Sequence, residues 1–224
     1  MKRTLSIFVI AGIFSCTISL SSSAQSTQQD RNATTKVAKT ELNTKATKAA
    51  RSEAKKLKKE GWLTTPGSLP IDKQLDRSYL MQYEFDDSGY PKYIMGEAMS
   101  IGENYDAAKM QALELSKQNL AGQVQTEMTA LVENSVANKQ LSADQAASVS
   151  SSVLASKNLI SQSLGRVIPV MEVYRTKDTK NKEVLVRIAY NRAQAVEAAK
   201  QAIRADLEAK GNKMHEQLDK ALGF

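Results

Sequence analysis

The chain has 224 residues, a formal net charge of +7, 42% apolar residues, one cysteine and one histidine. This length suits one domain of ordinary size with some additional chain, and the apolar share excludes a disordered protein. A single cysteine and a single histidine exclude metal sites built from these two ligand types. Because the chain also lacks a phosphate-cradling glycine loop and a dinucleotide fingerprint, we expect no cofactor.

The first 24 residues have the pattern of a secretory signal peptide. Two basic residues precede a short apolar run at 5–14, and small residues close the segment at Ala24. The run is too short to span a membrane comfortably. We expect cleavage after Ala24. The alternative is a bacterial lipobox with lipidation at Cys16, which we favour less because Phe14 is bulky for the position two before such a cysteine.

Positive charge is concentrated directly after this segment. Residues 25–60 contain ten basic and four acidic residues, which gives a net charge of +6. The two basic residues of the leader contribute +2 of the total, so residues 61–224 carry −1. Because residues 32–60 are rich in alanine and lysine and lack proline and glycine, we predict a basic helical arm over residues 25–60.

Two interpretations of this arm are open. It contacts an anionic component of the cell envelope, or it is a solvated helix whose charges serve solubility alone. Trp62 either closes the arm onto the body or is an exposed contact. Nucleic acid is not an expected partner, because no aromatic residues alternate with the lysines. The candidate envelope-contact residues are Lys45, Lys48, Arg51, Lys55, Lys56, Lys58, Lys59 and Trp62.

A connecting helix and a turn are predicted for residues 61–92. The segment at 61–69 contains the predicted boundary between arm and body. Apolar residues at four-residue steps predict a helix over 70–85, and the Asp, Ser, Gly and Pro residues of 86–91 are typical of a turn.

Residues 93–224 predict an α+β domain, with a small, mostly antiparallel sheet of about three strands and long helices packed on one face. Alternating apolar residues predict strands at 93–101, 167–174 and 184–190. Pro169 places the second of these at a sheet edge or at a bulge, because proline cannot donate to a strand ladder.

Three long helices are predicted in the same domain from their apolar periodicity and their capping residues. The first begins after Asn104 and extends to about Asn138. The second begins at Ser142 and ends at Gly165. The third follows Asn191, and its apolar stripe stays in register across a glycine near the C-terminus.

No catalytic constellation is evident, and we predict that the protein is not an enzyme. The single histidine falls on the polar side of the last helix, without a nucleophile motif. Glu97 lies among the larger side chains of its strand, which requires a partner for its charge. It is either half of a glycosidase-type carboxylate pair with Glu103 or Glu172, or it is ion-paired with Arg187 or Arg175. We favour the ion pair.

Four motifs carry a family resemblance. They are Gly-Glu-Ala at 96–98, the alanine-spaced helix start at 106–112, Leu-Ala-Gly-Gln-Val at 120–124 and the strand at 184–190. With them, residues 93–207 resemble the Lpp-twenty-like family of bacterial envelope lipoproteins, which is related to domains of flagellar outer-membrane assembly proteins. The patterns at 58–62 and 69–75 are similar to those of uncharacterised secreted proteins of Bacteroidetes-type bacteria.

The resemblance implies an envelope domain with no established catalytic activity. Together with the export signal and the basic arm, it predicts an exported protein of the periplasm or outer membrane that acts by binding or assembly. Its expected partner is an anionic lipid, a glycan or an envelope protein. One alternative is a carboxylate-dependent envelope hydrolase. The other is a helical structural protein, with homo-oligomers formed through the long helices.

Overall fold

The computed structural model describes residues 44–138, 140–177, 180–209 and 214–222. The predicted signal peptide, the alternative lipidation at Cys16 and the first part of the basic arm lie outside these residues. The residues from Ala46 onward belong to one compact unit, which is described below.

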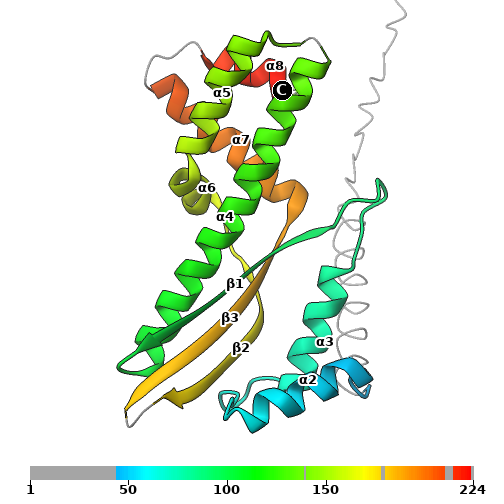
Figure 1. Cartoon of the computed structure of the whole chain (residues 1–224), viewed down its shortest axis with the longest axis vertical. Helices are drawn as coiled ribbons and strands as arrows, with labels where there is room; N and C mark the ends of the chain where they lie inside the picture. Colours follow the sequence, from blue (N-terminus) through cyan, green and yellow to red (C-terminus); the bar gives the residue numbers. More distant parts are fainter. Residues whose placement is uncertain (1–43, 139, 178–179, 210–213, 223–224) are drawn as a thin grey trace, which may run out of the picture. The chain divides into compact units, whose positions relative to one another are not determined.

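This unit contains a three-stranded antiparallel sheet and a long helix that runs across it (Figure 1). Further helices pack around the second half of the long helix. The predicted α+β class is therefore confirmed. The elements in chain order are α2 (Lys48–Lys59), α3 (Ile71–Gln82), β1 (Tyr93–Gly102), α4 (Tyr105–Ala137), α5 (Ala143–Ala155), α6 (Lys157–Ser163), β2 (Ile168–Lys177), β3 (Asn181–Asn191), α7 (Arg192–Ala209) and α8 (Met214–Leu222).

The strands lie in the order β1-β3-β2, so β3 is central and the other two are edges. Met95 pairs with Ala189 across β1 and β3, and Met171 pairs with Arg187 across β2 and β3. The register of β2 shifts between Pro169 and Met171. Both positions predicted for Pro169 are confirmed, since it lies on an edge strand and at a bulge.

The face of β1 that packs on α4 is the one with small side chains. Ile94, Gly96 and Ser100 are buried, whereas the larger Met99 and Ile101 are 48% and 45% exposed on the other face. A helix that packs closely on a strand needs small side chains beneath it. Side-chain size along β1 therefore does not indicate which face is buried.

The contact between α4 and the sheet is closest at Gly96. A Cβ at this glycine would collide with the carbonyl oxygen of Ser116 on α4. The Ser116 hydroxyl is fully buried and lies within hydrogen-bond distance of the carbonyl oxygens of Ala112 (2.8 Å) and Val186 (3.0 Å). The missing side chain at Gly96 and the hydrogen-bonded Ser116 thus allow the axis of α4 to lie close to the sheet.

Helices α5 to α8 surround the second half of α4 and complete the main core. The predicted caps at Asn104, Ser142 and Asn191 are confirmed by their hydrogen bonds to backbone N–H groups. The prediction of a single helix from Ser142 to Gly165 is wrong in one respect. The helix is interrupted at Ser156, which separates α5 from α6. The members of this core include Leu120, Val124, Met128, Val132, Val149, Val153, Ile160, Ile188, Ile203, Leu207 and Leu218.

The opposite face of the sheet receives α2 and α3, which form a second, smaller core with it. Leu63 pairs with Tyr174 of β2 through both backbone groups, at 2.7 and 2.9 Å. The predicted boundary at 61–69 is therefore wrong, and the compact unit instead begins at Ala46. The polar, Gly- and Pro-containing segment is a loop held to the sheet.

We predict that Gly96→Ala destabilises the protein by about 3 kcal/mol, because the added methyl group meets backbone that cannot move aside. Gly122→Ala on α4 is the matched control. Its new Cβ would lie 3.6 Å from the flexible side chain of Lys157, and alanine favours helix by about 1 kcal/mol. Urea denaturation measures both. Equal stability of the two variants would contradict the close approach at Gly96.

Candidate functional site

Helix α2 is held on the body by Trp62. This side chain is 3% exposed and packs with Ala50 and Ala54 of α2 and with Val173 of β2. The guanidinium of Arg175 lies 4.5 Å from the centre of the Trp62 ring. The interpretation of Trp62 as a residue that closes the arm onto the body is confirmed. Its assignment as an exposed envelope contact is wrong, because the ring is buried.

The turn after α2 explains how the tryptophan comes to be buried. Gly61 has a φ of +86°, a left-handed conformation that favours glycine. The chain therefore reverses direction, and the N–H of Trp62 donates to the carbonyl oxygen of Leu57 at 3.0 Å. The indole ring consequently lies beneath the last turns of α2.

The cations of α2 lie on the face away from the body. Five of them fall within about 100° of the helix circumference, and the middle of this arc lies about 110° from the mean direction of the buried Ala50 and Ala54. Lys56 flanks this group, and Lys45 precedes the helix; both are exposed. The five residues, called here the basic face, are Lys48, Arg51, Lys55, Lys58 and Lys59.

The acidic residues of α2 and its cap do not neutralise the basic face. Glu53 accepts a hydrogen bond from the hydroxyl of Tyr79 on α3. Glu60 lies 3.9 Å from Arg175 on β2. Within the described part of the chain, the structure records no ion pair for any candidate contact cation, from Lys45 to Lys59. These charges therefore face solvent together.

A cavity of about 410 Å³ adjoins the basic face at Lys58. Its walls are mainly apolar, and Leu63 is 54% exposed. The basic face places cations beside an apolar cavity. An amphiphilic anion could contact the cations with its charged group and the cavity with its apolar part. The lining residues are Lys58, Trp62, Leu63, Thr64, Ser68, Pro70 and Ile71.

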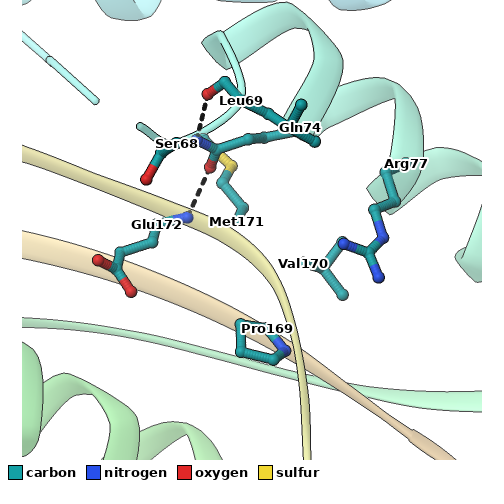
Figure 2. A pocket seen from close by; sticks show the side chains of 8 residues that line it. All are labelled: Ser68, Leu69, Gln74, Arg77, Pro169, Val170, Met171 and Glu172. Atoms are coloured by element: carbon teal, nitrogen blue, oxygen red, sulfur yellow. Dashed lines mark hydrogen bonds between the residues drawn. The ribbon is translucent and has the colours of Figure 1, made fainter. Parts of the chain in front are cut away.

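A smaller pocket of about 170 Å³ lies between α3 and β2 (Figure 2). The amide of Gln74, which is 5% exposed, donates to the carbonyl oxygen of Leu69 and accepts from the N–H of Glu172, both at 2.7 Å. Arg77 lies near Val170 on the far side. Sequence reasoning missed Gln74, whose only signal was a polar residue beside apolar Leu75. Its amide fixes α3 to the sheet.

The largest of these cavities, about 730 Å³, lies between the turn before β1, the start of β1 and α4. Its two charged residues satisfy each other, since Arg192 and Glu127 form an ion pair. The guanidinium of Arg192 also lies 4.5 Å from the centre of the Tyr90 ring. This cavity offers no unpaired charge for a ligand, unlike the basic face.

Glu97 is ion-paired with Arg187, as favoured from the sequence. The Nε atom of Arg187 lies 2.5 Å from Oε2 of Glu97, and the same guanidinium donates to the hydroxyl of Ser78 on α3 at 2.6 Å. The predicted partner for the charge is confirmed. The pair lies on the face of the sheet that receives α2 and α3.

The predicted pairing of Glu97 with a second carboxylate is wrong. Glu172 bonds to Tyr105 and to Lys109, both on α4 and therefore on the opposite face of the sheet. Glu103 follows Glu97 by six residues, about 20 Å along an extended strand. Glycosidase carboxylates lie about 5 to 9.5 Å apart on one cleft, so neither residue can complete such a pair.

Other site types find no support in the described residues. No group of three or more His, Cys, Asp and Glu side chains among them is arranged to hold a metal ion, and the single histidine, His215, is half-buried on α8. No helix in that part of the chain combines the length and hydropathy needed to cross a bilayer. Comparisons with protein-family models, curated proteins and solved structures found no match.

The Tyr79 phenol gives a pH-dependent test of the contact between α2 and α3. Burial and then the hydrogen bond to Glu53 raise the pKa of Tyr79 to about 12. This exceeds the unfolded value of about 10, so the stabilisation is complete below pH 10 and is lost as the pH rises through 12. We expect Glu53→Gln to lower this pKa only in part, because the burial remains.

Ultraviolet absorbance titration measures this pKa, and subtraction of the Tyr79→Phe profile assigns it. Glu84→Gln is the control, because Glu84 pairs with Lys92 and not with Tyr79. An unchanged Tyr79 titration in Glu53→Gln would contradict the contact.

Proposed function

We propose that this is a non-catalytic, exported protein of the cell envelope that binds an anionic surface through the basic face of α2. The observation that carries the proposal is the group of cations at Lys48, Arg51, Lys55, Lys58 and Lys59, unpaired within the described residues and beside an apolar cavity. The sequence patterns of the signal peptide and of the family resemblance support the location.

Of the three partners expected from the sequence, the geometry favours an anionic lipid. A lipid presents a negative headgroup and an acyl chain, and Lys58 lies at the wall of an apolar cavity. Each basic residue near an anionic membrane contributes about 1 kcal/mol. Five such residues contribute on the order of 5 kcal/mol, which corresponds to weak and reversible binding.

The attachment of α2 to the body makes this surface a defined one. Ala50, Ala54 and Trp62 fix the rotation of the helix about its axis, so the cations cannot turn toward the protein. A freely solvated arm would have to be ordered on binding, at a cost in conformational entropy. The hydrolase alternative, by contrast, has lost the carboxylate pair on which it depended.

We expect the protein to co-sediment with vesicles that contain phosphatidylglycerol and not with vesicles of phosphatidylcholine alone. Binding should decrease at least tenfold between 0.05 and 0.5 M salt, since exposed charges are screened. The triple variant Lys55→Glu/Lys58→Glu/Lys59→Glu should not bind.

The matched control is Lys117→Glu/Lys157→Glu/Lys180→Glu, which changes the net charge equally on the body. It should retain much more of the binding than the α2 variant does. Thermal unfolding of both variants establishes that they are folded. Equal binding by the two triple variants would contradict a specific role of the basic face, and the interpretation of a merely solvated helix would replace it.

A further inference from the structure

Side chains of α4 cover one half of the free edge of β1. The amide of Asn119 donates to the carbonyl oxygen of Glu97, and that of Gln123 to the carbonyl oxygen of Met95, each at 2.7 Å. These strand residues therefore direct their backbone groups away from β3. Residues two apart on a strand share this direction, so the backbone groups of Met99 point to the same edge.

The other half of the edge is open. Four residues of helix rise 6.0 Å and two residues of strand about 6.6 Å. The two elements therefore advance by similar steps, and Leu115 of α4 is level with Met99 of β1. The next residue in this series, Gln111, accepts a hydrogen bond from Ser100 at 2.6 Å. No described residue bonds the outward N–H or C=O groups of Met99 and Ile101.

The opposite edge of the sheet, on β2, differs from this one. Leu63 bonds both backbone groups of Tyr174, Gln74 bonds the N–H of Glu172, and the bulge at Pro169 interrupts the ladder. Bulges and bonded backbone groups protect a strand against further pairing. Residues 99–101 of β1 have neither protection.

The open segment is apolar and uncharged. Met99, Ile101 and Leu115 are 48%, 45% and 42% exposed, and together they are called here the edge patch. On α4, Gln111 and Gln118 carry no charge, and the exposed Glu114 accepts a hydrogen bond from Gln118. A complementary partner must therefore offer an uncharged, open strand edge. A second copy of this chain offers one, because the same segment of its β1 is apolar and open.

We propose that two copies of the protein pair antiparallel through β1, about a two-fold axis at Ser100. Met99 then lies opposite Ile101 of the second copy, and the open backbone groups of both residues gain partners. The two sheets become one continuous sheet.

The position of the axis follows from the same edge. A shift of the axis toward Glu97 would require a carbonyl oxygen that Asn119 already occupies, and a shift toward Glu103 would pass the end of β1. In the Ser100-centred pairing, Glu97 faces Glu103 of the second copy. Arg187 offsets the charge of Glu97, so this flanking pair does not prevent association.

Cysteine cross-linking tests the register in a Cys16→Ala background. Directly opposite residues have Cα atoms about 5.5 Å apart, within the range for a disulfide, whereas diagonal neighbours are about 7–8 Å apart. A mixture of Met99→Cys and Ile101→Cys proteins should therefore form at least tenfold more disulfide dimer than either variant alone. Tyr83→Cys, 69% exposed and outside the patch, is the control for random collision. A mixture no more reactive than this control would overturn the proposal.

Light scattering tests the association without engineered cysteines. The unmodified protein should have twice the chain mass at 100 μM, and Met99→Lys should halve it, while Tyr83→Lys should have no effect. Circular dichroism establishes that each variant is folded. A strict monomer would overturn the proposal. So would a dimer that Met99→Lys leaves intact but Met110→Lys on α4 dissociates, since the interface would then be helical.

Discussion

The close packing of α4 on β1 determines most of this structure. Because Gly96 has no side chain, the backbone of α4 at Ser116 lies directly against the strand, and the small residues of β1 face the main core. The larger Met99 and Ile101 consequently face outward. The same proximity lets Asn119 and Gln123 reach the strand edge, so one contact sets the buried face, the covered edge and the open edge.

A second constraint holds the helices on the other face. Trp62 lies beneath α2. Gln74 joins α3 to β2 by accepting from the N–H of Glu172, and it also donates to the carbonyl oxygen of Leu69 in the preceding loop. Both residues are buried, so water does not compete for their contacts. The charge distribution depends on this anchoring. Since the alanine side of α2 is against the body, the lysines of this helix point outward and form a surface of fixed orientation.

Local sequence signals predicted the elements well, because capping, alternation and proline placement depend on few neighbours. The caps at Asn104 and Ser142 and the bulge at Pro169 are examples. Features that depend on contacts distant in sequence were not predictable. Hydrophobic periodicity predicts neither the burial of Trp62 nor the contact of Gln74 with β2. The segment at 61–69 has the Gly- and Pro-containing composition of a linker, and only the structure shows that it pairs with a strand. The signal peptide and the family resemblance stay predictions.

The single tryptophan of the chain lies where the basic helix meets the body, against the guanidinium of Arg175. Its fluorescence therefore reports on the contact between α2 and the body, without an added label and without emission from another tryptophan. Detachment of α2 would expose the indole to water and shift its emission to longer wavelength, whereas binding at the outer lysines alone would leave it unchanged. The protein thus contains an optical probe that separates purely electrostatic contact at the lysines from any event that changes the surroundings of the indole.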